Sequence, residues 1–196
     1  MSDNTSPLLS ARDLSVRFGG VLAVNKVSFD VQRGEVFTLI GPNGAGKTTV
    51  FNLISRIYTP TSGEIDYAGP QGMLKLTDQP PQNVASLGIA RTFQNIELFE
   101  HASVLHNLLI GRHTHRTTGL WQDLFFTSKA RETELKSREK AEEVIELLDL
   151  QHYRESLVAG LPYGVRKVVE MARALCTEPK LLLLDEPSSG LNVEET

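Results

Sequence analysis

A glycine-rich segment near residue 45 has the residue types and spacing of a phosphate-binding loop. Residues 41–48 read Gly-Pro-Asn-Gly-Ala-Gly-Lys-Thr and match the pattern G-x-x-x-x-G-K-[ST]. Glycines let the backbone approach a polyphosphate, successive N–H groups form an anion-binding nest, and a helix that follows adds its positive dipole end. In this pattern the Lys47 ammonium reaches the β/γ-phosphates and the Thr48 hydroxyl ligates Mg²⁺. The predicted nucleotide-binding residues here are Gly41, Pro42, Asn43, Gly44, Ala45, Gly46, Lys47, Thr48 and Thr49.

Two adjacent carboxylates, Asp185 and Glu186, follow the apolar run of residues 181–184. Such a run predicts a strand buried on both faces, with the carboxylates at its end. One carboxylate there can bind a metal through water, and the next can orient or deprotonate an attacking water. Together with the phosphate-binding loop, the pair predicts a nucleotide hydrolysis site. The base-reading N-K-x-D pattern of GTPases is not matched, because residues 25–28 lack the aspartate and precede the loop.

Three further segments stand in the order found in ATP-binding-cassette (ABC) ATPases, and the sequence resembles this family over residues 8–196. Residues 91–94 resemble the Q-loop, and residues 161–165 occupy the place of the family signature. Residues 185–192 resemble the Walker B end followed by the D-loop. Details that match the subfamily importing branched-chain amino acids are Arg17–Gly20, Gly88–Gln94, Tyr163–Gly164 and Gly190–Asn192.

The resemblance implies ATP and Mg²⁺ as cofactors and gives roles to single residues. Asp185 would hold Mg²⁺ through water, together with Thr48, and Glu186 would be the general base. Gln94 would contact Mg²⁺ or the attacking water, which makes it both a catalytic and a metal-site candidate. The alternative for Gln94 is a solvent-exposed amide at the end of a strand.

Two contacts to the nucleotide are also implied by the resemblance. Phe18 would stack on the adenine, a contact of about 1–3 kcal/mol by analogy with base–aromatic stacking; its alternative is a core residue of a strand. Tyr163 and Gly164, at a helix start, would offer backbone N–H groups to the γ-phosphate bound by a partner subunit. Pro162 departs from the family's usual serine and has neither hydroxyl nor N–H, so one expected donor is missing.

The implied partners are a second ABC ATPase subunit, identical or paralogous and bound head-to-tail, and transmembrane permease subunits. A periplasmic solute-binding protein would be an indirect partner, and the expected location is the cytoplasmic face of the inner membrane. The 20 lysines and arginines against 24 aspartates and glutamates give a charge of −4, which argues against a strongly basic nucleic-acid binder. The first seven residues lack a secretory signal pattern, and the single Cys176 fits a reducing compartment.

The elements that must position these residues can be predicted from hydropathy. Residues 14–18 and 27–31 alternate as half-buried strands, whereas residues 36–40 form a continuous apolar run that predicts a strand buried on both faces. A helix is expected through residues 50–54 and a strand over residues 64–68. Residues 69–88 are expected to form a surface loop.

The second half of the chain is predicted to be mainly helical. Residues 103–157 have helical periodicity, and within them the charge-dense residues 129–143 predict the exposed face of a helix. An amphipathic helix follows, with Val165, Val169 and Cys176 among its inward residues, and then the strand of residues 181–184.

The predicted fold is therefore an α/β P-loop NTPase core of the ABC ATPase type, with an N-terminal antiparallel β subdomain and an inserted α-helical subdomain. Residues 8–95 and 160–196 form the α/β core, and residues 96–159 form the helical subdomain. The predicted function is the ATP-hydrolysing subunit of an ABC importer, with branched-chain amino acids as the expected cargo.

Two alternatives remain open from the sequence. One is a soluble ABC ATPase of DNA repair or translation, although those families carry coiled-coil insertions, zinc modules or tandem cassettes. The other is a fragment that binds nucleotide without hydrolysing it. By the resemblance, family members continue past residue 196 into a strand with a switch histidine, and none of the five histidines follows Asp185. Residues 1–196 alone are accordingly expected to be poorly soluble and nearly inactive.

Overall fold

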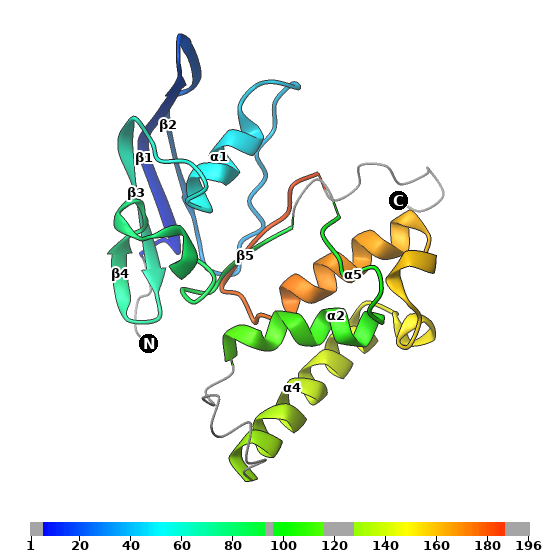
Figure 1. Cartoon of the computed structure of the whole chain (residues 1–196). Helices are drawn as coiled ribbons and strands as arrows, with labels where there is room; N and C mark the ends of the chain where they lie inside the picture. Colours follow the sequence, from blue (N-terminus) through cyan, green and yellow to red (C-terminus); the bar gives the residue numbers. More distant parts are fainter. Residues whose placement is uncertain (1–5, 93–95, 116–127, 187–196) are drawn as a thin grey trace. The chain divides into compact units, whose positions relative to one another are not determined.

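The computed structural model describes residues 6–92, 96–115 and 128–186, which fall into two compact units (Figure 1). The first unit is Met1–Ile89 and the second is Ala90–Thr196. Within the described part of the chain, no helix combines the length and the apolar character needed to cross a bilayer.

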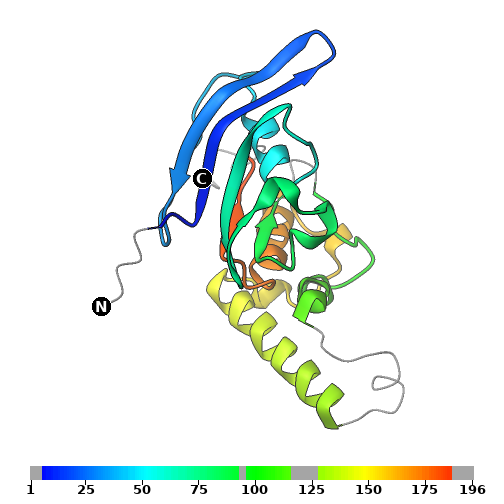
Figure 2. The same cartoon turned by 90° about the vertical axis from the view of Figure 1, so that its left-hand side faces the viewer.

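An antiparallel four-stranded sheet forms the framework of the first unit (Figure 2). The strands, in the spatial order β2-β1-β3-β4, are β2 (Val21–Val31), β1 (Leu9–Phe18), β3 (Ser62–Gly69) and β4 (Gly72–Lys75). The strands predicted at residues 14–18 and 27–31 are confirmed as parts of β1 and β2, but burial along β1 does not alternate, because Leu14, Ser15 and Val16 are all buried and Phe18 is exposed. The two strands turn at Gly19, whose φ of +56° suits a residue without Cβ. Leu9, Leu14 and Ile65 are fully buried at the sheet.

The helix expected through residues 50–54 is α1 (Lys47–Ile54), which buries Val50, Leu53 and Ile54. The strand expected over residues 64–68 is also confirmed, as part of β3. Helix α1 carries the end of the phosphate-binding pattern, because it begins at Lys47.

The prediction of a buried strand over residues 36–40 is wrong. The segment has no regular secondary structure, and Val36 and Ile40 are 94% and 91% exposed. A strand needs a neighbour for its N–H and C=O groups. Neither the four-stranded sheet nor the β5–β6 pair includes this segment among the described residues. The apolar run indicates that these residues favour burial, but it does not indicate which strand would pair with them.

The prediction of a surface loop over residues 69–88 is wrong in part. β4 pairs antiparallel with β3, and two 3₁₀ turns follow at Leu76–Asp78 and Pro81–Asn83. Leu76 is fully buried, and the Tyr67 hydroxyl donates to the Leu87 carbonyl at 3.2 Å. The apolar residues within this Gly/Pro-rich segment fold it back onto the sheet.

The second unit is built from helices and a short strand pair. Its helices are α2 (Val104–Gly111), α4 (Ser128–Leu147) and α5 (Tyr163–Leu175), and the paired strands are β5 (Ile89–Arg91) and β6 (Leu181–Leu183). Remaining 3₁₀ turns lie at Arg112–His115, Gln151–Tyr153 and Val158–Gly160. Leu108, Ile145, Val169 and Cys176 lie in one apolar cluster, which confirms the inward stripe predicted for α5.

A close backbone approach and a partly buried ion pair join α2 to the end of α5. A Cβ on Gly111 would lie 2.5 Å from the Arg173 carbonyl oxygen, so only glycine fits there without a shift. Arg112 donates from Nη1 to the Cys176 carbonyl at 2.8 Å and to Glu178 at 2.6 Å. Burial raises the pKa of the Cys176 thiol to about 12, so this side chain is a protonated core residue near neutral pH.

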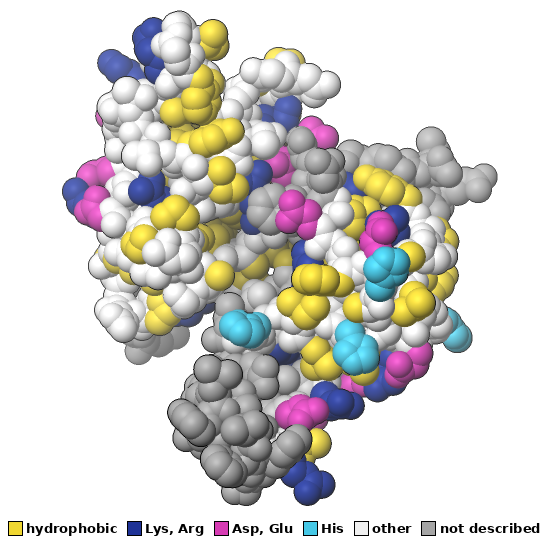
Figure 3. Space-filling model, in the orientation of Figure 1, with side chains coloured by type: hydrophobic (Ala, Val, Ile, Leu, Met, Phe, Trp, Pro, Cys, Tyr) yellow, Lys and Arg dark blue, Asp and Glu magenta, His cyan; other side chains and the backbone are white. Residues whose placement is uncertain are grey.

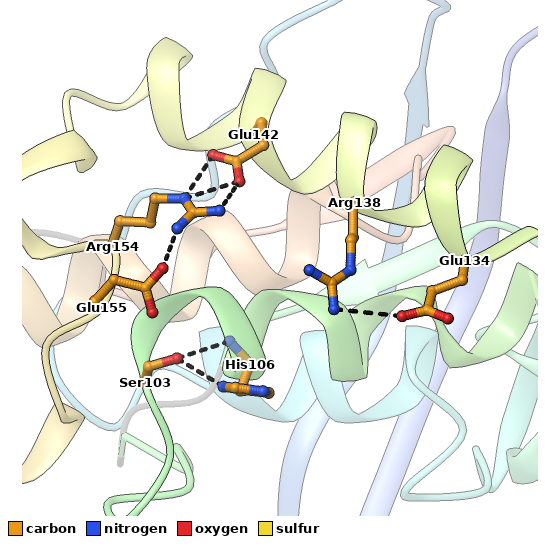
Figure 4. A network of polar contacts seen from close by, with 7 residues as sticks. All are labelled: Ser103, His106, Glu134, Arg138, Glu142, Arg154 and Glu155. Atoms are coloured by element: carbon orange, nitrogen blue, oxygen red, sulfur yellow. Dashed lines mark hydrogen bonds and ion pairs between the residues drawn. The ribbon is translucent and has the colours of Figure 1, made fainter. Parts of the chain in front are cut away.

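Exposed ion pairs cover the outer side of α4, as its charge-dense sequence predicted (Figure 4). Arg154 donates from Nε to both carboxylate oxygens of Glu142, at 2.8 and 3.0 Å, and also pairs with Glu155. These carboxylates raise the pKa of Arg154. In the same view Ser103 caps α2 by accepting from the backbone N–H of His106 at 3.2 Å.

Asn107 is a fully buried polar residue of the second unit, and its side chain makes several hydrogen bonds to the backbone. Its side chain donates to the carbonyls of Phe99 and Ser103, both at 3.0 Å, and accepts from the Phe99 N–H at 2.9 Å. The segment that precedes α2 is therefore fastened to the helix by three hydrogen bonds from one side chain.

We predict that Asn107→Leu, which keeps side-chain volume, lowers the free energy of unfolding by about 1–3 kcal/mol for each backbone group left unsatisfied. The exposed Gln151→Leu is the matched control and is expected to leave the urea midpoint nearly unchanged. Urea unfolding of both variants measures the difference. Equal midpoints would contradict the role given to Asn107.

Candidate nucleotide-binding site

The phosphate-binding pattern folds into a loop that leads directly into α1. Gly44 and Gly46 have φ of +80° and +87°, the left-handed conformation that favours glycine. Gly46 is the N-cap of α1 and, lacking a side chain, makes no capping hydrogen bond to the first turn of the helix. The backbone N–H groups of that turn therefore point to where an anion would bind.

Gly46 also explains how the loop is held on the sheet of its unit. A Cβ at this position would lie 2.6 Å from the Ala23 carbonyl oxygen of β2 and 3.4 Å from a methyl of Val24. The loop backbone thus packs directly on β2, and a larger residue would push it away. Glycine at this position therefore keeps the loop against β2.

The Lys47 ammonium lies over the loop that it follows in sequence. Nζ donates to the carbonyl oxygens of Gly41 at 2.7 Å and Pro42 at 3.0 Å. These carbonyls hold the positive charge at the loop, where it would meet the phosphates. Thr48 and Thr49 follow in the first turn of α1.

Phe18 is placed at the end of β1, next to the hairpin turn, and is 44% exposed. The alternative that Phe18 is a core residue of a strand is therefore wrong. Its ring lies outside the core because the buried part of β1 ends at Val16, two residues earlier. Tyr58 is the aromatic residue that packs against it.

In the second unit, β6 ends at the two carboxylates, which have different surroundings. Asp185 is buried and Glu186 is exposed. Glu186 has a φ of +51°, an uncommon backbone conformation for a residue other than glycine, asparagine or aspartate. One carboxylate is therefore held inside the unit while the backbone turn presents the other to solvent.

Asp185 is ion-paired with Arg91, which ends β5. Arg91 Nη2 lies 3.0 Å from Asp185 Oδ2, and the two side chains are only 7% and 3% exposed. The Thr92 N–H also donates to the Leu183 carbonyl at 3.0 Å, which extends the pairing of the two strands. The resemblance placed Arg91 in the Q-loop segment but assigned it no role, because the sequence does not show which residue contacts Asp185.

The signature segment forms the start of α5, as expected. Tyr163 is 46% exposed and Pro162 occupies the N-cap without a side-chain hydrogen bond. Lys167 lies 5.7 Å from the Tyr163 ring centre and brings positive charge to this first turn. Gly164 follows Tyr163 in the same turn. Gln94 and Asn192 lie outside the described residues.

The residues present fit a nucleoside triphosphate and its magnesium ion. The glycine cradle at residues 44–46 leaves no room for a Cβ at its last position, and Lys47 supplies a cation at the loop. The Thr48 hydroxyl in α1 is a hard oxygen ligand of the kind that Mg²⁺ prefers, and in the second unit Asp185 carries a carboxylate of the same kind. The loop and the helix that it leads into define a P-loop nucleoside triphosphatase.

Comparison with known proteins gives the family. Residues 24–189 match the ABC transporter family, and the chain belongs to it. It is 40% identical over 192 residues to LivG, a high-affinity branched-chain amino acid transport ATP-binding protein of Salmonella typhimurium, covering 98% of this chain and 74% of LivG. BraF of Pseudomonas aeruginosa is 40% identical over 190 residues, with 97% and 73% covered.

A solved structure extends this relationship to three dimensions. The ADP conformation of MJ1267, an ATP-binding cassette of an ABC transporter, has a TM-score of 0.78 and 32% identity, with 96% of this chain and 72% of that chain covered. The α/β P-loop fold of the ABC ATPases predicted from the sequence is confirmed.

We predict that Gly46→Ala weakens ATP binding at least tenfold, because the new Cβ must displace the loop from β2. Gly20→Ala is the matched control, since a Cβ there meets nothing within 4 Å. Calorimetric titration with ATP measures both. A Gly46→Ala variant with unchanged affinity would show that the loop adapts without loss.

We also predict that Arg91→Ala lowers the free energy of unfolding by about 3–5 kcal/mol, since it leaves a buried carboxylate without its cation. Lys136→Ala, which breaks an exposed ion pair with Glu132, is the control and is expected to leave the unfolding midpoint unchanged. Chemical denaturation compares them. Similar losses of unfolding free energy in the two variants would show that the buried pair contributes no more than the exposed one.

Proposed function

We propose that this chain is the ATP-binding and ATP-hydrolysing subunit of an importer for branched-chain amino acids. The observation that carries the proposal is the glycine cradle before α1, in a chain 40% identical to LivG over nearly its whole length. Its similarity to BraF supports the same cargo class. The reaction is the hydrolysis of ATP by water to ADP and phosphate.

Each site residue has a task in this proposal. The N–H groups of the loop and the first turn of α1 bind the phosphates, and Lys47 neutralises charge on the β/γ-phosphates. Thr48, Asp185 and Gln94 hold Mg²⁺, which supplies charge neutralisation of the phosphate oxygens when bound. Glu186 is exposed at the strand end and accepts a proton from the attacking water.

Two further contacts to nucleotide belong to the proposal, one to the nucleotide of this subunit and one to that of a partner subunit. Phe18 stacks on the adenine, and its 44% exposure leaves ring surface available for that contact. Tyr163 and Gly164 serve the nucleotide of a partner subunit through the first turn of α5.

The proposed assembly is a head-to-tail dimer of ATPase subunits, identical or paralogous, bound to transmembrane permease subunits at the cytoplasmic face of the inner membrane. A periplasmic solute-binding protein delivers the cargo to the permeases. In this arrangement residues 96–159 act as the helical subdomain, and residues 8–95 with 160–196 act as the α/β core.

We predict that Glu186→Gln slows ATP hydrolysis by about 10²–10⁴-fold while ATP still binds, because the amide cannot accept the proton. Glu139→Gln, on the exposed side of α4, is the matched control with the same chemical change. Phosphate release by the assembled transporter measures turnover, and calorimetry measures binding. Unchanged hydrolysis in Glu186→Gln would exclude Glu186 as the general base.

A further inference from the structure

Phe18 forms an aromatic pair with Tyr58 in the first unit. The two ring centres lie 4.9 Å apart at an interplanar angle of 69°, an edge-to-face arrangement. Both rings remain partly exposed, at 44% for Phe18 and 37% for Tyr58. Hydrophobic side chains are visible on the surface of this unit near the β1–β2 hairpin (Figure 3). The pair is thus open to a ligand and is not part of the core.

Tyr58 is the residue able to fix the Phe18 ring. The cross-strand partner of Phe18 is Val21, which is itself 69% exposed at the hairpin turn. A side chain that is largely in solvent gives a ring little orientation. Tyr58 reaches the ring from the connection between α1 and β3 and supplies a preferred geometry.

Backbone hydrogen bonds hold the Tyr58 connection on both sides. The Tyr58 N–H donates to the Asn52 carbonyl of α1 at 3.1 Å. Three residues on, the Thr61 N–H donates to the Ser15 carbonyl of β1 at 2.8 Å, and the Thr61 hydroxyl accepts from the Arg17 N–H at 3.1 Å. Tyr58 is therefore tied to the helix that starts at the phosphate loop and to the strand that ends at Phe18.

We propose that Tyr58 is a positioning residue for the adenine: by packing edge-to-face on Phe18, it orients that ring for stacking. The inference rests on the proposed function, in which Phe18 stacks on the base. It assigns Tyr58 to the base end of the nucleotide and leaves the phosphate end to the loop. Loss of Tyr58 then weakens the binding of ATP without weakening the binding of a phosphate chain that lacks a base.

The test measures two ligands on the full protein by calorimetry, ATP and inorganic tripolyphosphate. Tyr58→Ala is expected to weaken ATP binding about 2- to 12-fold, the range that an aromatic pair gives, and to leave tripolyphosphate binding unchanged. Tyr58→Phe keeps the ring and is expected to restore ATP affinity. Tyr58→Leu keeps apolar bulk without a ring, is expected to match Tyr58→Ala, and decides the result if the alanine variant does not fold.

The outcomes separate this inference from the function it rests on. Phe18→Ala is measured alongside, and unchanged ATP affinity in that variant would overturn the stacking role of Phe18 itself. If Phe18→Ala weakens ATP binding and Tyr58→Leu does not, stacking stands and the positioning role of Tyr58 fails. Equal weakening of ATP and tripolyphosphate by Tyr58→Leu would also overturn it, because it would mean that Tyr58 supports the phosphate loop.

Discussion

The packing of the Gly46 backbone on β2 is the constraint from which the nucleotide-binding half of the molecule follows. It fixes where α1 begins, and so the direction in which the backbone N–H groups of the first helical turn point. Glycine at position 46 thus places the phosphate-binding loop against β2. The same strand pairs with β1, which bears the base-stacking ring of Phe18.

In the second unit, several polar side chains are buried and are held by hydrogen bonds or ion pairs. Asn107 satisfies three backbone partners, and Arg112 joins the ends of α2 and α5 through a carbonyl and a carboxylate. Arg91 does the same for Asp185. Burying a charge is costly unless the charge is paired. Replacing one member of such a pair alone is therefore expected to lower the stability of the fold.

Much of the architecture was predictable because local patterns encode it. Alternating apolar and polar residues in the sequence predicted β1 and β2, although burial along β1 does not follow that alternation, and the apolar stripe predicted α5. The glycine pattern predicted the loop and the start of α1, since few residue types permit its backbone. The apolar run of residues 181–184 predicted a strand that ends near Asp185 and Glu186.

What escaped prediction depends on contacts between residues distant in sequence. Arg91 and Asp185 are 94 positions apart, and Phe18 and Tyr58 are 40 apart, so no local pattern joins them. The order within residues 69–88 was missed because Gly and Pro signals outweighed the short apolar stretch that forms β4. Residues 36–40 show the reverse case: their apolar run is typical of a buried strand, but no described strand pairs with them.

That unpaired segment has a consequence for how the chain behaves at high concentration. Residues 36–40 read Val-Phe-Thr-Leu-Ile, all with high β propensity, and contain no charge and no proline. Uncharged stretches of this composition, left open to solvent, template the addition of identical strands from other molecules. The segment just before the nucleotide loop is thus also the place where copies of this chain would begin to aggregate through intermolecular β-pairing.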